Sequence, residues 1–114
     1  MAKEEQNKEV ASKSEAEVVA STTIADVYKA AQQLEGVARH TKLMHSDFFS
    51  ELSGCEVYLK PENMQVTGAY KIRGAYYKIS TLTEEERARG LITASAGNHA
   101  QGVAFAARAF GCKA

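Results

Sequence analysis

The apolar positions along this 114-residue chain recur at helical spacing in several places, the first between residues 24 and 34. Either Thr22 or Thr23 can cap this helix, and Gly36 can end it. A second, shorter helix is predicted over residues 47–52, between Ser46 as its cap and Gly54 as its end. The apolar positions of the first helix are Ile24, Val27, Tyr28, Ala31 and Leu34.

The middle of the chain predicts a strand and two more helices. "CEVYLK", residues 55–60, has the composition of a strand, which Pro61 ends. A helix then begins near Lys71 with one apolar face, and Thr83 with Glu86 forms a capping box for a short helix that Gly90 closes. The apolar face predicted to enter the core consists of Ile72, Ala75, Tyr76, Ile79 and Leu82.

The last part of the chain predicts a strand, a turn and a buried helix. "LITA", 91–94, is interpreted as a buried strand, and "SAGNH", 95–99, as a turn. The helix "AQGVAFAARAF", 100–110, is apolar nearly all round and small in its side chains, so we expect it to pack closely on a sheet. This order is typical of the first part of a βαβ unit and predicts an α/β fold. The next strand would start after Gly111, so we expect the chain to be the front of a longer protein.

Composition narrows the class of protein. Residues 1–21 hold no aromatic residue and many charges, and they predict a disordered leader before one domain over 22–114. The 14 basic and 14 acidic residues cancel, which argues against nucleic-acid or anionic-membrane binding. No run is long enough to span a membrane and no signal peptide is recognisable, so we expect a cytoplasmic protein. Cys55 and Cys112 form no metal spacing, and no metal site is predicted.

The segment around Lys71 carries an unusual charge pattern. Lys71 and Arg73 stand in the first turn of the predicted helix, where the helix dipole disfavours cations, and no acid occurs from residue 63 to 83. Nearby positive charge favours the free amine of a lysine, the form that acts as a nucleophile, and it would also attract an anionic ligand. The alternative is a solvated basic face made of Lys71, Arg73 and Lys78.

The turn "SAGNHAQG" is the second candidate for chemistry. A strand that feeds a glycine-containing turn and a helix leaves backbone N–H groups free to bind an anion. Ser95, Asn98 and His99 add polar side chains at the same place. The alternative is a helix-capping turn in which Asn98 is the cap and His99 is solvated. The spacing matches neither a P-loop nor a dinucleotide-binding motif.

Together the two segments resemble a known family. Glu62 followed by Thr67-Gly68-Ala69-Tyr70-Lys71-Ile72-Arg73-Gly74-Ala75 is similar to the lysine signature of the serine/threonine dehydratases, and "TASAGNHAQGVAFAA" is similar to their asparagine loop. "EVYLKPENMQ" and "GVARHTKL" also fit, so the resemblance covers residues 22–114. It implies the tryptophan-synthase-β-like architecture (fold type II), with pyridoxal 5′-phosphate as cofactor, of which this chain would hold only the N-terminal portion.

The resemblance also implies a role for each matching residue. Lys71 would form the Schiff base with the cofactor and then act as the base at the substrate Cα. Asn98 would hydrogen-bond the 3′ oxygen of the cofactor ring, and Tyr70 would lie beside that ring. Glu62, Arg73 and Gly74 would support or pack around the site. The loop that would hold the substrate carboxylate consists of Ser95, Ala96, Gly97, Asn98 and His99.

Three positions depart from, or discriminate within, the family. Tyr70 stands where the family has Phe, and Thr41-Lys42-Leu43 replaces a Thr-Pro-Leu turn. Serine racemases carry a serine where this chain has Ala96, so the resemblance favours a dehydratase. The resemblance implies an enzyme that dehydrates and deaminates an amino acid, with threonine as the leading candidate. It also implies that the full-length protein is a homo-oligomer.

Two alternatives stay open at this point. One is a serine dehydratase or serine racemase of the same family, and the other is a non-catalytic remnant that keeps the anion-binding turn. The family's glycine-rich phosphate loop would lie beyond residue 114. We therefore expect these 114 residues alone to be inactive.

Overall fold

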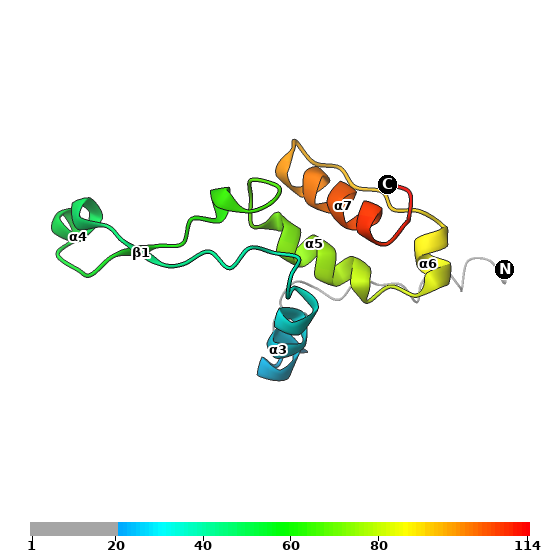
Figure 1. Ribbon diagram of the computed structural model, residues 1–114, viewed down its shortest axis with the longest axis horizontal. Helices are drawn as coiled ribbons and strands as arrows, with labels where there is room; N and C mark the ends of the chain where they lie inside the picture. The colour runs from blue at the N-terminus through cyan, green and yellow to red at the C-terminus, as the bar shows by residue number, and fades with distance from the viewer. Residues whose placement is uncertain (1–20) are drawn as a thin grey trace, which may run out of the picture. The chain divides into compact units, whose positions relative to one another are not determined.

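A computed structural model describes residues 21–114 of the chain, which divides into two units after Ala30. Of the predicted leader, 1–21, all but Ser21 lies outside the described residues. The described elements are α3 (Ile24–Gln33), β1 (Met44–His45), α4 (Asp47–Ser53), β2 (Tyr58–Leu59), a 3₁₀ turn (Glu62–Met64), α5 (Lys71–Ser80), α6 (Glu84–Ala88) and α7 (Asn98–Ala109) (Figure 1). None of these helices is long and apolar enough to cross a membrane.

Helix α3 begins where its local signals predict. The hydroxyl of Thr23 accepts a hydrogen bond from the Asp26 N–H (3.3 Å), and the Asp26 carboxylate accepts one from the Thr23 N–H (2.9 Å). This reciprocal pairing satisfies N–H groups that the first turn leaves free. The predicted helix is present, and none of its residues is buried.

Residues 43–59, here called the arm, form a hairpin that carries a helix at its tip. β1 pairs with β2 in antiparallel register, Met44 opposite Leu59, and α4 lies between the two strands. Ser46 caps α4, and Gly54 ends it in the left-handed conformation (φ 69°), so the predicted helix and both of its ends are confirmed. The strand predicted over 55–60 is limited to Tyr58–Leu59, because β1 offers only two residues to pair with.

Helices α5 and α7 form the core of the described chain. Ile72, Ala75 and Ile79 are buried on α5, which confirms that one face of the predicted helix is core, and the cluster between the helices is Ala75, Ile79, Val103 and Ala106. α7 starts at Asn98, two residues before its predicted start. The expectation that it packs on a sheet is wrong for the described residues, since its partner is α5 and their only sheet is β1 with β2.

The link between α5 and α7 holds one confirmed element and one error. Thr83 and Glu86 form the predicted capping box of α6. Residues 91–94 do not form the predicted buried strand, and Ile92 is fully exposed. A strand needs a paired neighbouring strand, whereas within residues 21–114 this segment makes one backbone bond, from Leu91 N–H to the carbonyl of Lys113 (2.8 Å).

Candidate active site

Lys71 is the first residue of α5 and is half-buried. The chain reaches it through a turn in which the Gly68 N–H donates to the carbonyl of Gln65 (2.9 Å), with Gly68 in the left-handed region at φ 70° that favours glycine. The next residue, Ile72, is completely buried and anchors the first turn of the helix. The Lys71 ammonium lies 5.2 Å from the centroid of the Tyr70 ring, within cation–π range.

The loop before α7 leads into a helix N-terminus that no side chain caps. Gly97 is the N-cap residue, and Asn98 and His99 belong to the first turn. The alternative in which Asn98 caps the helix is therefore wrong. Since the first N–H groups of a helix lack partners within it, this end has the capacity to bind an anion. The Ser95 hydroxyl accepts from the Gly97 N–H (3.2 Å) and holds the bend that precedes the helix.

The helix pair brings the two sequence motifs to one end. α5 and α7 lie side by side and run in the same direction, so their N-termini are together (Figure 1). Gly102 permits this close approach, because a Cβ at that position would lie 3.1 Å from the carbonyl oxygen of Lys71 and 3.3 Å from the Cβ of Ala75. His99 lines an open groove with Gly74 and Ala75 of α5. Ser95 and Ala96 are exposed at the same end of α7.

Arg73 is not the unpaired cation that the sequence predicts. Its guanidinium donates to both oxygens of Glu62, Nε to Oε2 at 2.9 Å and Nη2 to Oε1 at 2.8 Å. These bonds lower the pKa of Glu62 to about 2, assisted by the hydroxyl of Thr41 and opposed by burial. The same pairing raises the pKa of Arg73. The expected local excess of positive charge is therefore reduced to Lys71 itself and the helix termini.

Sequence patterns do not single out two residues that position the site. Gly102 sets the distance between the helices, and its signal is a glycine inside an otherwise strong helical pattern. Gln65 is only 3% exposed and hydrogen-bonds the backbone of Arg39 in both directions. No pattern of spacing marks Gln65, because its partner is 26 residues away in the chain.

The site residues suit an anionic, ring-containing ligand better than a metal. Among residues 21–114, no group of three His, Cys, Asp or Glu side chains is arranged to hold a metal ion. The same end of the helix pair instead offers an amine, an aromatic ring beside it and the free N–H groups of α7. An aldehyde-bearing, ring-containing cofactor such as pyridoxal phosphate would use the amine and the aromatic ring, and the N–H groups of α7 suit the carboxylate of a substrate.

Comparison with known proteins identifies the family that this chain matches. The model of the family described as "Pyridoxal-phosphate dependent enzyme" matches residues 34–114. Among curated proteins, the chain is 55% identical over 92 residues to an L-threonine ammonia-lyase of Thermotoga maritima, which is 81% of this chain and 23% of that protein. The chain spans about a quarter of the length of the curated relatives it matches.

Solved structures give the same result for the fold. A threonine deaminase from T.th. matches with a TM-score of 0.70 and 38% identity, over 81% of this chain and 32% of that one. A serine racemase from Dictyostelium discoideum matches with a TM-score of 0.75 and 37% identity, over 81% and 30%. The predicted fold class, the α/β architecture of fold type II, is confirmed for the matched portion.

Proposed function

We propose a function for this chain, which belongs to the family of pyridoxal-phosphate dependent enzymes. The proposed activity of the complete protein is the dehydration and deamination of L-threonine to 2-oxobutanoate and ammonia. The observation that carries this proposal is the close approach of Gly102 to the Lys71 backbone, which holds α5 and α7 together with the starts of both helices at one end. The 55% identity to an L-threonine ammonia-lyase supports threonine as the substrate.

Three residues of this chain would hold the cofactor. Lys71 would attach it covalently through its amine, Tyr70 would lie against its ring, and Asn98 would hydrogen-bond the ring's 3′ oxygen. Pyridoxal phosphate, when bound, supplies the electron sink that stabilises negative charge at the substrate Cα. The protein then has to position the ring and to present a base on one side of it.

Lys71 is also the base in this proposal. With its amine free, Lys71 would take the proton from the substrate Cα. That proton and the departing β-hydroxyl together make up the water that the dehydration releases. The position of Lys71 at the start of α5, fixed between buried Ile72 and Gly102, limits how far its backbone can move. Such restraint favours proton transfer, because the transfer requires hydrogen-bond distance.

The 95–99 loop would bind the substrate carboxylate. Side chains would come from Ser95, Asn98 and His99, and Ala96 and Gly97 complete the loop. The free N–H groups are those of the first turn of α7, which begins at Asn98. A carboxylate at a helix N-terminus is stabilised both by those donors and by the helix dipole. The name of the matched L-threonine ammonia-lyase supports an amino acid as the source of that carboxylate. We further propose that the complete enzyme acts in the cytoplasm as a homo-oligomer.

Racemisation is a second candidate, because a serine racemase structure matches this chain as well as a threonine deaminase does. Ala96 argues against it. A racemase of this family would use a serine hydroxyl at that position as an acid on the opposite side of the cofactor, and a methyl group cannot donate a proton. The loop of this chain therefore supports removal of the Cα proton by Lys71, with no side chain at position 96 that could donate a proton to Cα from the opposite side of the cofactor.

The test compares Lys71→Ala with Lys78→Ala, a matched control in which an exposed lysine of the same helix is removed. The protein expressed from its complete gene is mixed with pyridoxal phosphate, its visible absorption is recorded, and 2-oxo acid is assayed with threonine and with serine. We expect Lys71→Ala to abolish both signals and Lys78→Ala to keep both. An unchanged absorption band in Lys71→Ala would refute the assignment of Lys71. D-Serine as the main product would refute the dehydratase.

A further inference from the structure

We propose that Glu62 is a positioning residue for Lys71, which it holds in place by binding Arg73 and thereby fixing the start of α5 against residues 39–41. This inference rests on the proposed function, because it assigns Glu62 a task in the chemistry of Lys71. Glu62 itself touches neither the Lys71 amine nor the 95–99 loop by any hydrogen bond within residues 21–114. Its effect is transmitted through the backbone.

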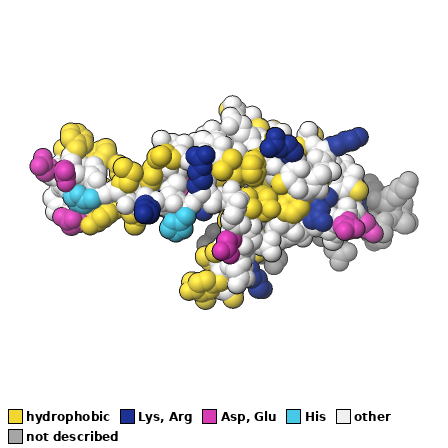
Figure 2. Space-filling model, in the orientation of Figure 1, with side chains coloured by type: hydrophobic (Ala, Val, Ile, Leu, Met, Phe, Trp, Pro, Cys, Tyr) yellow, Lys and Arg dark blue, Asp and Glu magenta, His cyan; other side chains and the backbone are white. Residues whose placement is uncertain are grey.

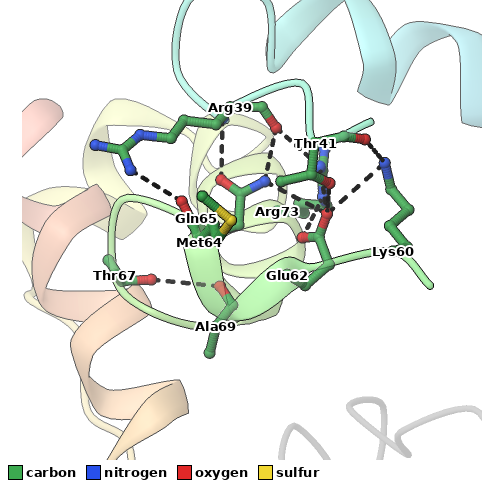
Figure 3. Close-up of polar contacts among 9 residues, drawn as sticks. All are labelled: Arg39, Thr41, Lys60, Glu62, Met64, Gln65, Thr67, Ala69 and Arg73. Atoms are coloured by element: carbon green, nitrogen blue, oxygen red, sulfur yellow. Dashed lines mark hydrogen bonds and ion pairs between the residues drawn. The ribbon is translucent and has the colours of Figure 1, made fainter. Parts of the chain in front are cut away.

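Both oxygens of the Glu62 carboxylate are in use (Figure 3). Oε2 accepts from Arg73 Nε at 2.9 Å, and Oε1 accepts from Arg73 Nη2 at 2.8 Å and from the Thr41 hydroxyl at 2.6 Å. The side chain is only 18% exposed, so solvent weakens these bonds little. A two-point bond between planar groups fixes orientation as well as distance, which a single contact does not.

Gln65 and Arg73 bind the backbone of Arg39 at the same place. The Gln65 amide accepts from the Arg39 N–H (2.9 Å) and donates to the Arg39 carbonyl (2.7 Å), as a neighbouring strand would. That carbonyl also accepts from Arg73 Nη2 at 3.1 Å. Lys60 extends the cluster by donating to the carbonyl of Thr41 (2.6 Å). Three stretches of chain, around 39–41, 60–65 and 73, are thus joined by one polar cluster (Figure 3).

Lys71 lies in the chain between these anchors. Gln65 precedes it by six residues and Arg73 follows it by two, with the tight turn at Gly68 between. On the other side, Gly102 places α7 against the carbonyl of Lys71. The backbone of Lys71 is therefore restrained by the cluster before and after it and by α7 beside it. A misplacement of the amine of about 1 Å is enough to cost about a hundredfold in rate.

The cluster does not serve as an acid or base. A carboxylate that accepts three hydrogen bonds from Arg73 and Thr41 stays ionised, and its pKa of about 2 agrees with this. No side-chain nitrogen or oxygen that is buried within residues 21–114 lacks a hydrogen-bond partner. Both Glu62 oxygens are therefore committed to holding the chain.

The experiment compares Glu62→Gln and Arg73→Lys with Glu85→Gln, a matched control on the exposed face of α6. Each variant of the complete gene product is mixed with pyridoxal phosphate and reduced with borohydride at timed intervals, and the label on Lys71 is measured by mass spectrometry. Hydrogen exchange of the amides of residues 66–73 is recorded in parallel. The kcat and KM for threonine are determined for each variant.

We expect Glu62→Gln to label Lys71 about tenfold more slowly, to lose about tenfold to a hundredfold in kcat with KM nearly unchanged, and to exchange faster over 66–73. Glu85→Gln should match the unsubstituted protein. If Glu62→Gln does not fold, Arg73→Lys tests the positioning role, because lysine keeps the positive charge at position 73 and cannot form the two-point bond to Glu62. It is expected to show the same losses in milder form.

The outcomes separate the two proposals. Wild-type rates of labelling, exchange and kcat in both cluster variants would overturn the positioning role and leave the function standing. Equal losses in kcat with no change in labelling or exchange would also overturn it. Failure of the unsubstituted protein to be labelled at Lys71 would instead refute the proposed function.

Discussion

The α5–α7 pair and the arm are built by the same local signals, but only the first forms a packed core. α4 in the arm has a serine N-cap and a left-handed glycine at its end, as complete a set of signals as any helix of the described chain. Its side chains Phe48, Phe49 and Leu52 nevertheless remain 44–74% exposed, whereas Ile72 on α5 is fully buried. Figure 2 shows hydrophobic side chains gathered over the α4 end of the arm.

Caps decide where a helix begins and ends, while burial depends on a complementary surface. α5 finds that surface in α7, because small residues such as Gly102 and Ala106 let the helices approach closely. The arm has none within residues 21–114 that covers its apolar side chains. The site lies where packing fixes the backbone, so substitutions of apolar residues should cost more there than in the arm.

The largest effect is expected from removing core volume. Ile72→Ala should lower the free energy of unfolding by about 3 kcal/mol, because it opens a cavity at a fully buried position. Leu52→Ala in the arm, where the side chain is 74% exposed, should change it by less than about 0.5 kcal/mol. Urea unfolding of both variants measures the contrast, and equal losses would show that the arm is packed in solution.

A close second is expected from adding volume between the helices. Gly102→Val should cost about 2–3 kcal/mol, because its side chain would meet the Lys71 backbone, which cannot rotate away. Ala104→Val on the exposed part of the same helix is the matched control and should cost about 0.5 kcal/mol. Thermal unfolding reports both changes. A tolerated Gly102→Val would mean that the α5–α7 contact is loose.

A smaller, pH-dependent effect is expected from Glu62. Its pKa is lowered in the folded protein, from 4.5 to about 2, so its stabilising contribution is complete above pH 4.5 and is lost as the pH falls toward 2. The difference in unfolding free energy between the unsubstituted protein and Glu62→Gln should be about 2 kcal/mol at neutral pH and should shrink as the pH falls below 4.5. A difference that stays constant from neutral pH down to about pH 3 would contradict the ion pair.

The smallest effects should be alike in the two regions. Ser46→Ala in the arm and Thr83→Ala before α6 each remove a cap and should each cost about 1 kcal/mol. The costs are similar because capping is local and does not depend on a packed core. Circular dichroism with urea unfolding measures them, and a cost confined to Thr83→Ala would show that α4 gains nothing from its cap.

Elements defined by local signals could be predicted from the sequence. The caps at Thr23, Ser46 and Thr83 and the buried face of α5 are each encoded within a few residues, and all are confirmed. The prediction of a buried strand at 91–94 was wrong because strand formation depends on neighbours that local sequence cannot supply.

The sequence predicts the motifs of the candidate site but not the ion pair that holds the start of α5 in place. Lys71 and the 95–99 loop are marked by charge, glycine and spacing, and the structure places them at one end of the helix pair. The Glu62–Arg73 pair was missed, because Glu62 stands one residue before the acid-free stretch and reaches Arg73 only through the turn at Gly68. Pairing of this kind follows from the path of the chain, which short-range patterns do not contain.

Lys71 is proposed as the residue to which pyridoxal phosphate attaches, and one labelling experiment tests this assignment without relying on any variant. The unsubstituted protein from the complete gene is incubated with pyridoxal phosphate, reduced with borohydride, digested and mapped by mass spectrometry. We expect a single stoichiometric label, on Lys71, that threonine present before reduction diminishes. A label confined to exposed lysines such as Lys78, or spread over several lysines and insensitive to threonine, would contradict the assignment.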